Sequence, residues 1–164
     1  MTTTDDQVRW LSPEERAAWL AVAALIVKLP NALDAQLQHD QRLSFFEYMI
    51  LAVLSEQDDH TLQMSDIAEF TSGSLSRLSH TVTRLEREGL VTRERMRGPG
   101  RRTCARLTDA GYAKVVAAAP GHVERVREVL IDAVTPEQLD ALRGIGEAVL
   151  ARIDPDRTCT DGRV

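Results

Sequence analysis

Three segments of the chain share the pattern of a helix start, and they fix the frame of the fold. Each has a serine or threonine suited to cap a helix and a glutamate or glutamine three residues later. The segments begin at Ser12, Ser44 and Thr135, and the first and third add a proline at the first helical position. The sequence therefore predicts three helices with defined starts, the first running from Ser12 toward Gln38.

The predicted first helix is apolar on two faces. Its longest uninterrupted apolar run, Ala17 to Val27, has eleven residues, about half of what a helix needs to cross a bilayer. We expect a buried helix that meets a partner subunit as well as its own core, because both faces need cover. Pro30 is expected to kink or split it. No cationic segment precedes the run, so we expect a cytoplasmic protein with no membrane partner.

Charge is unevenly distributed along the chain. The 164 residues carry a net charge of −5, yet residues 72–106 carry nine arginines against three acidic residues, a local net charge of +6. A cationic segment on an acidic protein is typical of a surface that binds a polyanion. A solvated arginine surface without a partner is the alternative. The nine are Arg77, Arg84, Arg87, Arg93, Arg95, Arg97, Arg101, Arg102 and Arg106.

The cationic segment also has the element order of a winged helix-turn-helix. A short helix is predicted around Ser65 to Phe70, then a turn and a second helix from Ser74 to about Glu88. Two short strands, Leu90 to Glu94 and Thr103 to Leu107, flank a tip rich in glycine and proline. Such a module places its second helix in the major groove and its hairpin in an adjacent minor groove.

The second helix of this module separates an apolar stripe from a polar face. On a helical wheel the stripe consists of Leu75, Leu78, Val82 and Leu85. The opposite face carries hydroxyls, an imidazole and guanidiniums but no carboxylate, which suits contacts with bases and phosphates. The predicted DNA-binding residues are Ser76, Arg77, His80, Thr83, Arg84 and Arg87 on this helix and Arg97, Arg101 and Arg102 on the hairpin tip.

The chain after the hairpin is predicted to be helical. Thr108 and Asp109 start a long helix that is expected to break at Pro120-Gly121. The fold class is therefore mainly α with a small β-hairpin wing. We expect residues 43–107 to form a DNA-binding lobe, residues 12–40 and 108–154 to form the helical regions that flank it, and residues 155–164 to form a polar tail.

From Leu43 to about Ile153 the chain resembles the MarR-type (multiple antibiotic resistance regulator) repressors. The resemblance lies in Met64–Ala68, Ser74–His80, Val82–Val91, the paired Arg101 and Arg102, and Leu107–Gly111. It implies a winged helix-turn-helix with N- and C-terminal dimerisation helices, so that residues 12–40 and 108–154 form the helical dimerisation region. It also implies a homodimer whose two recognition helices face a pseudo-palindromic operator in double-stranded DNA. The implied function is a sequence-specific transcription regulator, a repressor rather than an activator.

The resemblance further implies release from DNA by a small aromatic or anionic effector. His39, Phe46 and Tyr48 are the residues expected to line its cleft, although core packing of the two aromatic rings is an equally good interpretation. One position departs from the family. Gly100 stands where wings of this family usually carry an aspartate before the first of the paired arginines, so Arg101 lacks that local acidic partner.

Other functions have less support in the sequence. Nucleotide-binding and nucleophile motifs were not found, so we expect neither an enzyme nor a bound cofactor. The histidines lie far apart along the chain and neither cysteine has a histidine nearby, so no metal site is expected. Three alternatives stay open: a winged helix that docks another protein, a metal-responsive regulator of the same fold, and a redox-responsive one that uses Cys104.

Overall fold

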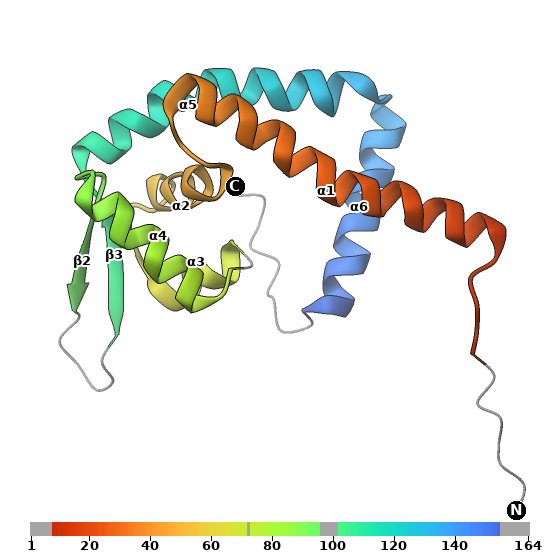
Figure 1. Cartoon of the computed structure of the whole chain (residues 1–164), viewed down its shortest axis with the longest axis horizontal. Coiled ribbons are helices and arrows are strands. Elements are labelled where there is room, and N and C mark those ends of the chain that lie inside the picture. Colours follow the sequence, from red (N-terminus) through yellow and green to blue (C-terminus); the bar gives the residue numbers. More distant parts are fainter. Residues whose placement is uncertain (1–7, 72, 96–101, 155–164) are drawn as a thin grey trace, which may run out of the picture.

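A computed structural model of the chain describes residues 8–71, 73–95 and 102–154. Helices dominate these residues, and a small antiparallel sheet completes the fold (Figure 1). The elements are α1 (Pro13–Gln41), α2 (Phe45–Ser55), β1 (Thr61–Gln63), α3 (Met64–Phe70), α4 (Leu75–Arg87), β2 (Val91–Arg95), β3 (Thr103–Leu107), α5 (Asp109–Val129), the 3-10 helix η1 (Ile131–Ala133) and α6 (Pro136–Ile153).

All three predicted helix starts are confirmed. Ser12, Ser44 and Thr135 each cap a helix, and each forms a reciprocal capping box with the residue three positions later. The backbone N–H of Phe45 also donates to Asp34 Oδ1 at 2.8 Å. This bond ties the start of α2 to α1, so the two helices are joined where the lobe meets the long N-terminal helix.

Neither internal proline ends its helix, so α1 is not split at Pro30 and the expected break of α5 at Pro120-Gly121 is wrong. α1 is continuous through Pro30 and α5 is continuous through Pro120. Both prolines are exposed, so the carbonyl that each leaves without a helical N–H donor can be hydrated instead. Gly121 does not break α5 either. A Cβ there would lie 3.1 Å from Gln36 Nε2, so this glycine lets α5 pack closely along α1.

The sheet has one strand more than the hairpin that the sequence predicts. Its order is β1-β3-β2, and both pairings are antiparallel. β1 pairs Thr61 with Arg106 and Gln63 with Cys104. It was missed because three residues are too few to show the two-residue alternation of a strand. The predicted strands at residues 90–94 and 103–107 are confirmed within one residue.

The hydrophobic core lies in the lobe formed by α2, α3, α4 and the sheet, beneath α1 and α5 (Figure 1). α2 is central to it, and Ile50, Leu51 and Leu54 are fully buried. α4 contributes three buried side chains and β3 contributes Ala105 and Leu107. The core therefore fixes α4 on one face and leaves its other face to solvent.

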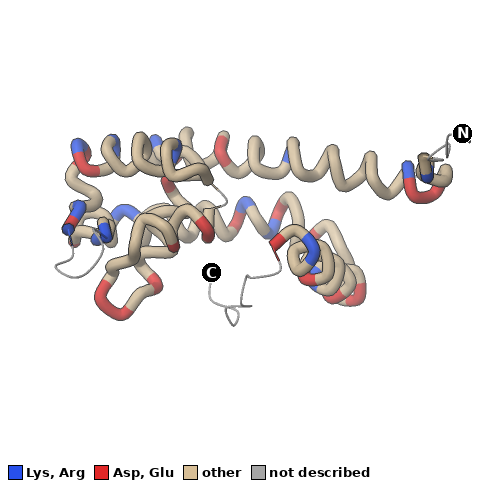
Figure 2. Tube along the Cα trace, turned by 90° about the horizontal axis from the view of Figure 1, so that it is seen from below, with Lys and Arg blue, Asp and Glu red and all other residues tan. Residues whose placement is uncertain are grey.

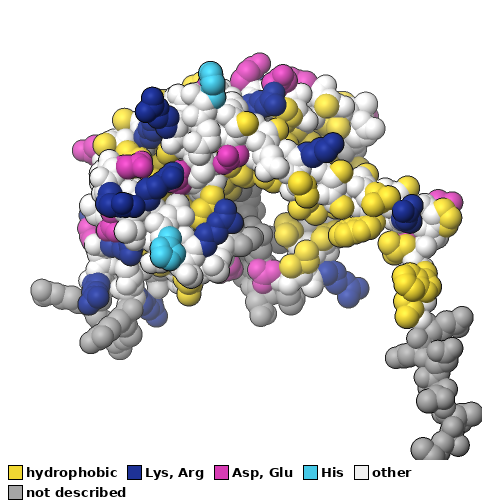
Figure 3. Space-filling view, viewed as in Figure 1, with side chains coloured by type: hydrophobic (Ala, Val, Ile, Leu, Met, Phe, Trp, Pro, Cys, Tyr) yellow, Lys and Arg dark blue, Asp and Glu magenta, His cyan; other side chains and the backbone are white. Residues whose placement is uncertain are grey.

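The N-terminal half of α1 and the whole of α6 expose apolar side chains. Ala17–Val27 is not buried in the single chain: Trp19 is 56% exposed and Ile26 61% exposed. Among the described residues α1 is also the helix that is long and apolar enough to cross a membrane, by length and composition alone. No residue of α6 is buried. In Figure 3 hydrophobic side chains gather over both helices.

Candidate nucleic-acid interface

α4 is anchored by its apolar face and presents the rest of its surface. Ser74 caps the helix by accepting a hydrogen bond from the Arg77 N–H at 3.2 Å. Leu78, Val82 and Leu85 are fully buried, as the wheel predicts. Leu75 departs from the predicted stripe, since it is 58% exposed. Its position in the first turn lies beyond the edge of the core.

The outer face of α4 is polar, exposed and free of carboxylates. Ser76, His80 and Arg87 lie on it, with about one helical turn between the first two and about two turns between the last two, and all three are exposed. Figure 2 shows that Lys and Arg positions gather at the end of the molecule that carries α4, β2 and β3. This end therefore combines a regular helical surface with positive charge, which is what a duplex requires of a partner.

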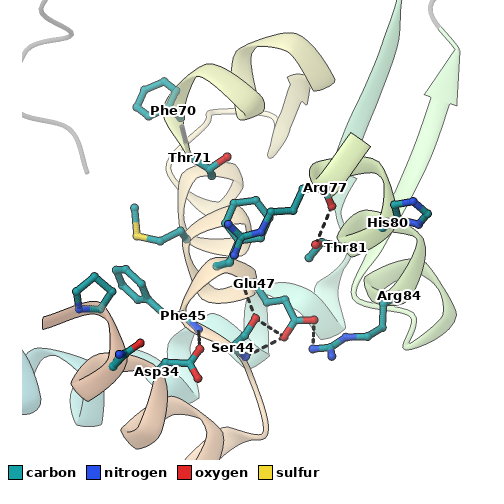
Figure 4. Close-up of a pocket in the computed structure, with 14 residues that line it drawn as sticks. Asp34, Ser44, Phe45, Glu47, Phe70, Thr71, Arg77, His80, Thr81 and Arg84 are labelled. Atoms are coloured by element: carbon teal, nitrogen blue, oxygen red, sulfur yellow. Dashed lines mark hydrogen bonds and ion pairs between the residues drawn. The ribbon is translucent and has the colours of Figure 1, made fainter. Parts of the chain in front are cut away.

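One flank of α4 is held by α2 (Figure 4). Arg84 Nη2 forms an ion pair with Glu47 Oε1, and the Glu47 side chain is only 2% exposed. The guanidinium of Arg77 stacks on the Phe46 ring, with 4.2 Å between its central carbon and the ring centroid. Two of the arginines that were predicted to contact DNA are thus already engaged by residues of α2.

The other flank of α4 is held by β2. The backbone N–H of Arg93 donates to Glu86 Oε1 at 3.0 Å, and the two side chains form an ion pair with Nε and Oε2 3.0 Å apart. Arg93 Nη2 also donates to the carbonyl oxygen of Ser79 at 2.9 Å and to the Thr83 hydroxyl. Thr83, predicted to contact DNA, is exposed but uses its hydroxyl within the protein.

Glu47, Glu86 and Arg93 are therefore residues of this interface that the sequence analysis did not assign. The sequence identifies Glu47 only as the capping-box residue three positions after Ser44. The structure confirms that role, because Glu47 Oε2 accepts hydrogen bonds from the N–H and the hydroxyl of Ser44, both at 2.8 Å. Glu86 lies seven residues before Arg93, and this spacing does not predict a contact in a helix or a strand. The two residues meet because the chain reverses at Gly89. Gly89 makes that reversal with a φ of 72°, in the left-handed region that glycine tolerates.

The wing is described only in part. Arg97, Arg101 and Gly100 lie outside the described residues, whereas Arg102 is described and exposed. Arg106 on β3 is 3.7 Å from Glu94 on β2, measured from Nη1 to Oε1. Both of these side chains are about half exposed, so the pair adds little to stability.

A groove of about 600 Å³ separates α4 from α1 and α2. Its walls include Phe46, together with Arg77 and Arg84, which Figure 4 labels. Of the three residues expected to line an effector cleft, Phe46 alone lies in this groove. The side chain of His39 is 88% exposed and its Nδ1 lies 2.7 Å from Asp40 Oδ1.

Tyr48, the third of these residues, is buried in the core. Its ring lies 4.4 Å from that of His122, measured between centroids, so the core interpretation fits Tyr48. Burial raises the pKa of the Tyr48 hydroxyl, and the charge of Glu56 raises it further. Burial also holds the pKa of His122 below its ordinary value of 6.5. His122 Nδ1 is buried without a hydrogen-bond partner.

Cys104 lies on β3 and is 4% exposed. Burial and the nearby Asp66, Asp59 and Glu94 carboxylates, partly offset by Arg102, raise the pKa of its thiol. A raised pKa reduces the thiolate form that redox chemistry requires. Within the described ranges, no three His, Cys, Asp or Glu side chains converge on a point where a metal ion would fit.

Comparison with known proteins places this arrangement in a family. Residues 43–102 match the MarR family. Sco3205, a MarR family transcriptional regulator from Streptomyces coelicolor solved in complex with DNA, is 38% identical, with a TM-score of 0.87 over 93% of this chain and 95% of that one.

AbsC, a MarR family transcriptional regulator from the same organism, is 35% identical, with a TM-score of 0.84 over 90% of this chain and 99% of that one. None of the curated proteins compared matched the chain. The identity to Sco3205 extends over nearly all of both chains, beyond the lobe and into the flanking helices. The chain belongs to the MarR family of transcriptional regulators.

Proposed function

We propose that this MarR family regulator binds duplex DNA as a homodimer, with α4 of each subunit in a major groove and the wing formed by β2 and β3 at the adjacent minor groove. One observation carries the proposal. α4 presents an exposed, carboxylate-free outer face at the cationic end of the molecule, while both of its flanks are fixed by neighbouring elements. A helix held this rigidly can read base edges, because the positions of its side chains are set before binding.

The outer face supplies the specific contacts in this proposal. Ser76, His80 and Arg87 face the major groove of the DNA, and Arg77 and Thr83 lie at the two edges of the outer face of α4. Arg102 contacts the backbone or the minor groove, together with Arg97 and Arg101, which are assigned from the sequence. Residues 43–107 act as the DNA-binding lobe, and residues 12–40 and 108–154 as the dimerisation region.

A second copy of the chain covers the exposed apolar side chains of α1 and α6 in this proposal. The N-terminal half of α1 and the whole of α6 lie outside the lobe core, and α6 packs little against the rest of the described residues. Ile145, Val149 and Ile153 are each more than half exposed and recur along one face of α6. Cover by a protein partner also accounts for α1 in a cytoplasmic protein, with no need for lipid contact.

Two-fold symmetry would place the two α4 helices on half-sites about one helical turn apart. We infer a repressor without enzymatic activity, in keeping with the family of transcriptional regulators to which the chain belongs. A shift assay with the chain's own upstream intergenic DNA against random competitor tests this function. We expect at least about a thousandfold preference for the specific duplex. Equal binding of both duplexes would contradict sequence-specific DNA recognition and favour the alternative of a winged helix that docks another protein.

We propose the groove beside α4 as the site of the effector. The Phe46 ring, with the Arg77 guanidinium stacked on it, lines the groove together with Arg84, and an aromatic ring beside guanidiniums suits a small planar anion. Benzoate and substituted benzoates are suitable probes in calorimetry. Phe46→Ala is expected to weaken their binding at least about fivefold, whereas His39→Ala, outside the groove, is the matched control. Equal affinities in both variants would remove the groove from the proposal.

A further inference from the structure

The pair formed by Glu47 and Arg84 joins the recognition helix to the lobe. Glu47 is the one charged residue of the described ranges that is buried, and it is 1% exposed. Both of its oxygens are engaged: Oε2 by the N–H and hydroxyl of Ser44, Oε1 by Arg84. A carboxylate this buried keeps its partner, because leaving it uncompensated in the core is costly.

Arg84 itself is not buried. Its side chain is 45% exposed, and its Nε also lies 3.7 Å from Glu88 Oε1. Two carboxylates therefore compete with any phosphate for this guanidinium. The Glu47 carboxylate is fixed by its Ser44 bonds at the start of α2, so it holds Arg84 in one place relative to the core (Figure 4).

From these contacts we propose that Arg84 is a positioning residue. It acts through Glu47 to set how α4 lies across the lobe, and it does not neutralise a phosphate. This inference rests on the proposed DNA binding. It differs from the sequence-based assignment, in which Arg84 belongs with the residues that touch DNA. Specificity is the property at stake, because a small rotation of α4 displaces every side chain on its outer face.

The test is a double-mutant cycle read at several salt concentrations. Glu47→Gln, Arg84→Gln and the double variant are compared with wild type on specific and random duplexes. Each single variant is expected to lower the ratio of specific to random affinity about tenfold, and the double variant by about the same tenfold, because both remove one interaction. The slope of log affinity against log salt concentration stays unchanged in all three, since the number of phosphate contacts stays the same.

Two further variants separate positioning from general stability. Arg84→Lys keeps a cation for Glu47 and is expected to retain specificity within about threefold of wild type. Val115→Ala, in the buried part of α5, lowers the melting temperature but leaves the specificity ratio unchanged.

Two results would overturn the proposal: a salt slope that falls by about one unit in Arg84→Gln, or an unchanged specificity ratio in Glu47→Gln. The first would make Arg84 a phosphate contact. If wild-type protein itself bound both duplexes equally, the proposed DNA recognition would fail, and the assignment of Arg84 would fail with it.

Discussion

In the proposed complex with DNA, individual side chains divide between reading bases and neutralising phosphates. Arg77 borders the outer face of α4, where a guanidinium can fork onto a guanine, whereas Arg102 directly precedes β3 at the tip end of the wing. We expect Arg77→Ala to cost about 1–3 kcal/mol on the best operator and to relax preference at one base pair. Binding to a panel of single-base operator variants measures this.

Arg102→Ala is the matched comparison for Arg77→Ala. It is expected to weaken specific and random duplexes alike and to reduce the salt slope by about one unit. If the two variants gave the same pattern across the operator panel, the division between base reading and backbone contact would be wrong.

His122 gives the fold a pH dependence at the scale of one residue. Because burial holds its pKa below 6.5 in the folded protein, the unfolded chain takes up a proton at a higher pH than the folded one does. Stability is therefore fully present above about pH 6.5 and falls as the pH drops toward the lower, folded pKa.

We expect thermal unfolding at pH 7.5 and 5.5 to show a loss of melting temperature in acid that His122→Phe reduces by several degrees. The phenylalanine keeps the contact with Tyr48 and Phe45 and removes the titrating group. His80→Asn, on exposed α4, is the control and retains the wild-type dependence. An identical acid response in His122→Phe would mean that other groups set it.

At the scale of elements, the junction of α5 with the sheet depends on the absence of a side chain. A Cβ at Gly111 would lie 2.1 Å from the backbone oxygen of Leu90 and 2.6 Å from Leu107 Cδ1. The Thr108 hydroxyl donates to the carbonyl oxygen of Gly89 at 2.7 Å and so ties the same junction. This close contact fixes α5 to the base of the wing.

Gly111→Ala is therefore expected to lower the free energy of unfolding by about 3 kcal/mol, because backbone must move to admit the methyl group. Gly144→Ala on α6 is the matched control. A Cβ there meets nothing within 4 Å, so the gain in helix propensity stabilises that variant by up to about 1 kcal/mol. Chemical denaturation measures both. A neutral Gly111→Ala would contradict the packing described for this junction.

The elements that were predictable from sequence are those determined by local chemistry. Capping boxes, the glycine that closes α4 and the apolar stripe of that helix act within a few residues, so their consequences are legible along the chain. Pro120 and β1 were misjudged for a different reason. Pro120 stays in a continuous helix because its face of α5 is exposed to water, and β1 forms because it pairs with β3. Both conditions are set by how distant parts of the chain pack together.

For the candidate site, the sequence likewise predicts the local features and misses the tertiary contacts. The sequence identifies α4 and its polar face, because charge and helical spacing are local properties. It does not show which arginines are already engaged. Arg84 pairs with Glu47 on α2, and Arg93 pairs with Glu86 in the last turn of α4. Only the tertiary packing brings these carboxylates within reach of the two arginines.

At the scale of the whole molecule, pairing of two chains is the expectation with the largest consequence. The double variant Ile145→Asp/Val149→Asp places charges on the apolar face of α6 and is expected to be monomeric in sedimentation. Its affinity for the operator should fall at least about a hundredfold, since each half-site is then bound alone. Ala151→Asp, about 200° around the helix from Val149, is the control. A dimeric double variant would exclude this face.

The long apolar surface of α1 makes a solitary chain an unfavourable species in water. In the proposed homodimer, association and native stability are linked by mass action, so dilution alone is expected to shift the unfolding transition to lower temperature. A newly synthesised chain that has not yet formed this dimer is expected to be vulnerable to aggregation and proteolysis. The abundance of the regulator in its host thereby influences how long each copy survives.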